Sequence, residues 1–125
     1  MEYNFLKVNE TFPKCTSRSK RSLKKLHLYE FADTLIYIDF PVATYGNDNE
    51  DVLLDIIHEH DNSCFVFASA NNTNIMFDVK TSEFTEEMVK EYCHGLLLRL
   101  SEVEPNFAQI EKITINYGDA YYGEW

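Results

Sequence analysis

The chain has 125 residues, of which 45% are hydrophobic and 14% aromatic, and a formal net charge of −10. This apolar content excludes a disordered chain and is ample for the core of one domain, while the acidic charge opposes direct binding to nucleic acid or to anionic membranes. No apolar run reaches the ~20 residues that cross a bilayer. We therefore expect a single domain over residues 1–125, with no membrane partner.

The charge is divided unevenly along the chain. Residues 1–25 carry seven Lys and Arg against two acids, a sum of +5, whereas residues 26–125 carry four Lys and Arg against nineteen acids, a sum of −15. An acidic body attracts basic partners across about 10 Å at 0.1 M salt. The partner that this charge predicts is a basic protein.

The three cysteines, Cys15, Cys64 and Cys93, are odd in number and show no CxxC spacing. Cys64 lies in an apolar, strand-like run and Cys93 on the apolar stripe of a predicted helix, where free cysteine is commonly a small buried hydrophobe. Three reduced thiols indicate a cytoplasmic protein.

The first third of the chain predicts strands on either side of a basic segment. Residues 3–8 predict a short strand, and residues 10–25 lack periodicity and predict a mobile loop or arm. Residues 25–31 and 34–40 alternate apolar with other side chains, which predicts a hairpin whose second strand is closed by Pro41.

The basic segment 14–25 (KCTSRSKRSLKK) has two open interpretations. Six Lys or Arg in twelve residues are typical of a segment that binds nucleic acid or an anionic surface. The segment has no aromatic residue for base stacking, however, and the attached body repels nucleic acid. The alternative is a solvated loop over the protein's own acidic surface, so we predict no direct nucleic-acid partner.

A helix is predicted over residues 49–60, with Asp48 or Asn49 as its N-cap. One side of this helix carries four acids at spacings of three, four and four: Asp48, Asp51, Asp55 and Glu59. Since no Lys or Arg follows four residues on, each like-charged pair costs a few tenths of a kcal/mol. That cost favours a surface that binds something basic. An ordinary solvated helix face is the alternative.

Three elements follow that helix. Residues 63–69 are apolar on both faces, which is typical of a central strand, and a turn at 71–72 leads to a strand over 74–80. A second helix begins at Thr85 and ends before Pro105. Its apolar stripe has helical spacing and consists of Met88, Val89, Tyr92, Cys93, Leu96, Leu97, Leu100 and Val103.

The last predicted strand covers 110–117 and is followed by an aromatic, acidic tail over 118–125. Tyr and Trp are enriched at the energetic centres of protein interfaces. We therefore add this end of the chain to the partner-binding residues: Tyr117, Asp119, Tyr121, Tyr122, Glu124 and Trp125. Alternatively, these rings pack on the open face of the sheet. We group Tyr45, in the loop before the first helix, with these aromatic residues.

The element order β-β-β-α-β-β-α-β predicts an α+β fold. In this fold a mainly antiparallel sheet of about five to six strands carries two helices packed on one face.

Catalytic and metal-binding patterns are weak in this chain. The run His58-Glu59-His60-Asp61 separates its two histidines by two residues, so on a helix they point about 200° apart and cannot easily share one ion. Cys93 and His94 are neighbours on a helix and face different directions. None of the four glycines belongs to a phosphate-binding motif. We therefore predict no enzyme, no metal and no cofactor.

The function that we expect is neutralisation of a basic toxin or nuclease by a stoichiometric complex, as an immunity or antitoxin-like inhibitor. Such a protein needs an acidic face and aromatic anchors but no chemistry, and its charge accelerates association. One alternative is a phage-type polyanion mimic that inhibits a nucleic-acid enzyme such as a restriction or CRISPR effector. Another is an acidic secretion chaperone, which would normally be a homodimer. For the inhibitor we expect a monomer.

Overall fold

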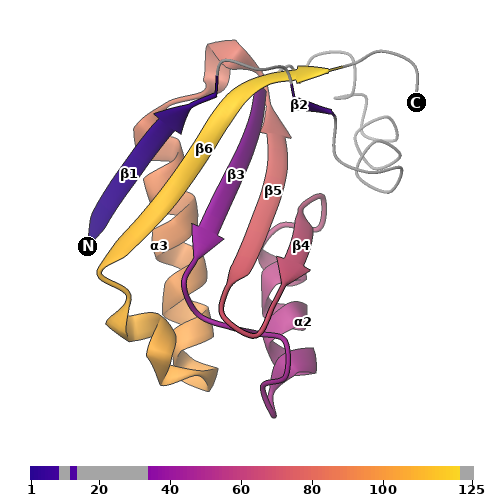
Figure 1. The fold of residues 1–125 in the computed structure, drawn as a ribbon, viewed down its shortest axis with the longest axis vertical. Helices are drawn as coiled ribbons and strands as arrows, with labels where there is room; N and C mark the ends of the chain where they lie inside the picture. Colours follow the sequence, from indigo (N-terminus) through magenta and orange to yellow (C-terminus); the bar gives the residue numbers. More distant parts are fainter. Residues whose placement is uncertain (9–11, 14–33, 122–125) are drawn as a thin grey trace.

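The computed structural model describes residues 1–8, 12–13 and 34–121. Its strands are β1 (Glu2–Lys7), β2 (Phe12–Pro13), β3 (Thr34–Phe40), β4 (Phe65–Ala68), β5 (Thr73–Val79) and β6 (Lys112–Tyr121). Its helices are α2 (Glu50–His60) and α3 (Glu86–Val103), with short 3-10 turns η1 (Thr81–Glu83) and η2 (Pro105–Gln109). The α+β fold that the sequence predicts is confirmed (Figure 1).

The strands form one mixed sheet in the order β1-β6-β3-β5-β4, and the two residues of β2 also pair with β6. β3 pairs antiparallel with β5 on one edge and with β6 on the other. β1 and β2 both run parallel to β6. The last strand of the described chain therefore lies inside the sheet, between the first strand and β3.

Both helices cover one face of the sheet, with α3 behind β1 and β6 and α2 behind β4 and β5 (Figure 1). They bury the apolar sides that the helical spacing predicts. α2 buries Leu53 and Ile57, and α3 buries Val89, Cys93, Leu96, Leu97 and Leu100. These side chains meet the inward-facing residues of the sheet in one core, which includes Ile36, Ile38, Ile75, Ile113 and Ile115.

The helix and strand predictions are largely confirmed in the described ranges. α3 begins after Thr85, whose hydroxyl accepts a hydrogen bond from the Met88 amide at 3.0 Å, and it ends before Pro105. α2 begins after Asn49, although no side chain caps it. The strand predicted over 25–31 and most of the segment 10–25 lie outside the described residues. The predicted hairpin of 25–31 with 34–40 is wrong, because one edge of β3 pairs with β5 and the other with β6.

β4 corrects one prediction, because the apolar run 63–69 forms an edge strand and not a central one. β4 pairs with β5 alone among the described strands. Val66 packs on the core, whereas Phe65 and Phe67 share the other face, with ring centroids 5.9 Å apart, and Phe67 is 40% exposed. An apolar run shows that both faces can be buried, but it does not show whether both edges are paired.

β6 corrects a second prediction. The strand does not end at residue 117 but continues to Tyr121, so the first residues of the predicted tail belong to the sheet. Thr34 pairs with Asp119, and β2 pairs with 120–121. Neither helix of the described chain is long and apolar enough to span a bilayer.

Candidate functional site

The acidic face of α2 is the first candidate site. Asp48, Asp51, Asp55 and Glu59 are all exposed, as their spacing predicts. A short turn positions the start of the helix: Gly46 adopts a φ of 79°, and Asn47 accepts a hydrogen bond from the Asn49 amide through its side-chain oxygen at 2.9 Å. The positive φ of Gly46 suits glycine, because this backbone conformation is costly for other residues. This turn places Asp48 just before Asn49, the N-cap residue of α2.

Among the described residues, only one acid of this row has a cationic partner. Arg99 of α3 binds Glu59 at 2.5 Å, which supplies from another helix the compensation that the sequence of α2 lacks. The range 34–121 contains sixteen acids and four Lys and Arg. Three of those four cations are in ion pairs: Lys80 with Glu83, Lys90 with Glu87, and Arg99 with Glu59. Within the described residues, Asp48, Asp51 and Asp55 have no cation within 4.0 Å.

Two exposed apolar side chains accompany the acids. Val52 is 48% exposed and projects on the same side of α2 as Asp55, and Tyr45 is 60% exposed in the preceding turn. Large apolar side chains beside unpaired charges are a feature of protein interfaces, where aromatic residues provide much of the binding energy. We call Tyr45, Asp48, Asp51, Val52 and Asp55 the α2 surface.

The end of β6 does not join the α2 surface, and this holds for Tyr117. Its ring faces the helix side of the sheet and stacks on Phe84, with centroids 4.9 Å apart. Tyr117 thus completes the edge of the core.

The other predicted tail residues divide into two groups. Asp119 and Tyr121 lie in β6, with Asp119 opposite Thr34 at the start of β3, whereas the loop to α2 leaves from Phe40 at the other end of β3. Six residues of strand separate these ends by roughly 20 Å. Tyr122, Glu124 and Trp125 lie outside the described residues.

The run His58-Glu59-His60-Asp61 sends its side chains to different partners. Glu59 binds Arg99, and Asp61 accepts a hydrogen bond from the Ser63 amide at 2.9 Å. The His60 ring lies edge-on to Tyr92, 4.8 Å between centroids, with Nε2 3.1 Å from the Tyr92 carbonyl oxygen. In the part of the chain that the structure describes, no three His, Cys, Asp or Glu side chains gather to hold an ion. The run instead joins the end of α2 to α3.

Two titratable groups are buried beside this junction. Burial raises the pKa of the Tyr92 hydroxyl, and the nearby Asp61 carboxylate raises that pKa further. Burial also raises the pKa of the Cys93 thiol to about 12. A thiol with such a pKa stays protonated at neutral pH and is a poor nucleophile.

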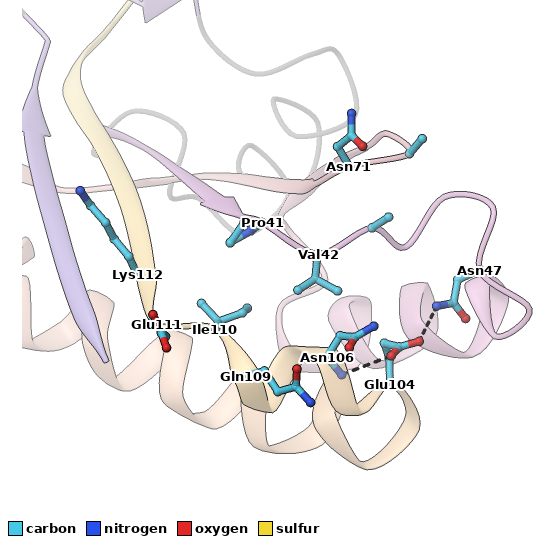
Figure 2. A pocket seen from close by; sticks show the side chains of 12 residues that line it. Pro41, Val42, Asn47, Asn71, Glu104, Asn106, Gln109, Ile110, Glu111 and Lys112 are labelled. Atoms are coloured by element: carbon cyan, nitrogen blue, oxygen red, sulfur yellow. Dashed lines mark hydrogen bonds between the residues drawn. The ribbon is translucent and has the colours of Figure 1, made fainter.

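A polar cleft of about 710 Å³ lies next to the α2 surface, at the end of the sheet where β3 leaves for α2 and β6 begins (Figure 2). Its lining comes from four segments of the chain. The polar lining residues are Asn47, Asn71, Glu104, Asn106, Gln109, Glu111 and Lys112, and Val42 and Ile110 are among the apolar ones. Most of the polar groups are carboxamides and carboxylates.

One carboxylate in this cleft is held in place by two hydrogen bonds. The Asn47 side-chain amide donates to Glu104 Oε2 at 2.7 Å, and the Asn106 backbone amide donates to Glu104 Oε1 at 3.2 Å (Figure 2). Asn47 precedes Asp48, so the cleft and the acids of α2 meet at this turn.

The sequence predictions did not include the cleft. Its carboxamides come from short loops far apart in the chain, and only the sheet order brings these loops to one end of the molecule. The available signal was the frequency of Asn and Gln in the loops that follow β3, β4 and α3.

The chain was also compared with known proteins. No protein-family model, no curated protein and no solved structure matches it.

Proposed function

We propose that this protein binds a basic protein through the α2 surface and neutralises it as an immunity or antitoxin-like inhibitor in the cytoplasm. The observation that carries the proposal is the row of three exposed aspartates, Asp48, Asp51 and Asp55, which have no cation within 4.0 Å in the part of the chain that the structure describes. Three of the four Lys and Arg in 34–121 pair with other acids. Within 34–121 the row therefore carries negative charge that no Lys or Arg compensates.

The energetics of α2 support a surface adapted to a partner. Asp51 lies in the first turn, where it interacts favourably with the helix dipole, but Asp55 lies in the second turn and gains little from it. Asp51 and Asp55 are four residues apart and repel each other by a few tenths of a kcal/mol. Lys or Arg side chains of a partner would remove this repulsion and accelerate association.

The apolar side chains beside the row favour a fitted protein interface over a pure mimic of a phosphate backbone. A polyanion mimic needs charge at regular intervals, whereas Tyr45 and Val52 add exposed apolar area between and beside the charges. Cys64 and Cys93 are buried and form no disulfide among the described residues, which supports a reducing compartment. The raised pKa of the Cys93 thiol supports a binding role without covalent chemistry.

Affinity capture of the partner from the native cytoplasm tests this proposal. The tagged chain is used at low salt and again at about 0.5 M salt, where the Debye length is only a few ångströms. We expect one basic protein, recovered in stoichiometric amount and weakened by salt. Asp51→Lys/Asp55→Lys should abolish its capture while the midpoint of thermal unfolding stays nearly constant.

A matched variant controls for the change in net charge. Glu91→Lys/Glu102→Lys adds the same charge on the exposed side of α3 and should retain capture. Equal loss in both variants would show that only the overall charge matters. Unchanged capture by Asp51→Lys/Asp55→Lys would exclude the α2 surface as the interface. Capture of no partner, or of the protein itself only, would count against the inhibitor role.

A further inference from the structure

We infer that the polar cleft is a binding site for an arginine side chain of the basic partner, with Glu104 as the carboxylate that receives the guanidinium group. The inference rests on the proposed function, because it assumes a basic protein partner. It adds a second and more specific contact to the general attraction of the α2 surface.

Glu104 is prepared for a bidentate contact before any ligand arrives. Each of its two oxygens accepts one hydrogen bond within the protein, from Asn47 and from the Asn106 amide. A carboxylate oxygen has two lone pairs, so each oxygen retains one for a ligand. A guanidinium group offers two parallel N–H donors that match this geometry. Since the side chain is already fixed, less conformational entropy is lost on binding.

The rest of the lining suits a guanidinium group and its stem. Two carboxylates, Glu104 and Glu111, face one cation, Lys112, so the cleft has a net charge of −1. The carboxamides of Asn106 and Gln109 add oxygen acceptors, and Val42 and Ile110 offer apolar contact to methylene groups (Figure 2). Pockets for small ligands commonly measure ~300–1,000 Å³, so the cleft has room for one long side chain.

Arginine fits this lining better than lysine does. A planar guanidinium group has five donors in a fixed arrangement and is weakly hydrated, whereas an ammonium group is a compact, strongly hydrated point charge. Because Asn47 joins the cleft to Asp48, one basic segment can place an arginine on Glu104 and further basic residues along α2.

The test titrates the isotope-labelled full chain with N-acetyl-L-arginine methylamide and follows the side-chain amides by NMR. We expect saturable shifts at Asn47, Asn106 and Gln109, with a Kd on the order of millimolar, and weaker shifts with the lysine analogue. Glu104→Gln should weaken binding about tenfold, because a charge-assisted pair is lost. Lys112→Gln should strengthen binding about threefold, because it removes the cation that competes with the ligand.

Several outcomes would overturn the inference. These are shifts confined to the α2 acids, no shifts at all, equal binding of the lysine analogue, or much tighter binding of free L-arginine, which would indicate a small-molecule site. The gain expected for Lys112→Gln keeps the test decisive even if Glu104→Gln perturbs the turn at Asn47. The titration uses no partner, so its failure is distinguishable from failure of the capture experiment with Asp51 and Asp55.

Discussion

The two helices cover the same face of the sheet, but they are stabilised differently. α3 has 18 residues, a threonine N-cap and its own ion pair between Glu87 and Lys90. α2 has 11 residues, no side-chain cap and no Lys or Arg of its own. α3 therefore carries local stabilisation along its surface, whereas α2 depends on its buried side and on α3.

The junction between the helices makes this dependence visible. Arg99 of α3 neutralises Glu59, and His60 lies against Tyr92 and next to Gly95. These contacts fix the C-terminal end of α2, whereas Asp51 and Asp55 lie nearer its N-terminus and Asp48 lies before it. Substitutions can measure how far α2 relies on its buried side and on α3.

The largest effect should come from the core beneath both helices. Leu53 in α2 and Leu96 in α3 are both 0% exposed, so replacing either with alanine should lower the free energy of unfolding by about 2–5 kcal/mol. Val52→Ala and Leu98→Ala are the matched exposed controls and should change it by less than about 0.5 kcal/mol. Urea unfolding measures all four. A cost below 1 kcal/mol for Leu53→Ala would show that α2 is not anchored by its buried side.

Alkaline pH should destabilise the fold through the α3 side of the core. The unfolded Cys93 thiol ionises near its ordinary pKa of 9.0, whereas the folded thiol keeps its proton until about 12. The unfolded chain therefore binds fewer protons between these values, and the free energy of unfolding falls as pH rises, by up to about 1.4 kcal/mol per pH unit. Below pH 9 this contribution is fully present.

Urea unfolding from pH 8 to 11 measures this slope. The raised pKa of Tyr92 steepens it above pH 10, and Cys93→Val should flatten it. A Cys93→Val chain with the same slope as the native chain would contradict the assignment to Cys93.

In a Cys15→Ser chain at pH 8, we expect the thiols of Cys64 and Cys93 to react with a thiol reagent only after unfolding.

Gly95 tests the close approach of the two helices. A Cβ atom at this position would lie 3.2 Å from His60 Cε1. Alanine in a helix is favoured over glycine by about 0.8–1.0 kcal/mol, but here the His60 ring would have to move from its place against Tyr92. We expect Gly95→Ala to bring no gain in the native chain and about 1 kcal/mol in a His60→Ala chain. Equal effects in both chains would exclude the coupling.

The smallest effect should come from the ion pair between the helices. A double-mutant cycle with Glu59→Gln and Arg99→Gln should give a coupling of about 0.2–1 kcal/mol, because both side chains are partly exposed. The same cycle on Glu87 and Lys90 should give about 0.3–0.5 kcal/mol at most. Both couplings should fade at 1 M salt, and a coupling that persists would indicate a buried contribution.

Periodicity in the sequence was sufficient to locate most of the elements. The spacing of three and four residues from Met88 to Val103 predicts α3 and its buried side, and alternation predicts the inward residues of β3 and β5. Edge pairing has no comparable signal, because any strand with a buried face can pair with several neighbours. The parallel pairing of β1 with β6 and the edge position of β4 therefore became visible only in the structure.

The same limit applies to the candidate site. The acids of α2 were predicted to be exposed, since one helix determines their common side. The pairing of Glu59 with Arg99 depends on how two helices pack, and the two residues are 40 positions apart in the chain. The cleft depends on loops that are far apart in the chain and that only the sheet order brings together. Tyr117 was assigned to the binding surface from composition, although its alternation with Ile113 and Ile115 places its ring on the buried side of β6.

The interior position of β6 has a consequence for synthesis of the protein. Glu2 pairs with Lys112, so β1 emerges from the ribosome about 110 residues before its partner. At about 5–20 residues per second, this strand waits roughly 5–20 s with its pairing edge unused. The edge of β3 that β6 will cover also stays open during this time. Until β6 is made, the unpaired edges of β1 and β3 in the nascent chain are therefore exposed to proteases and to other nascent chains.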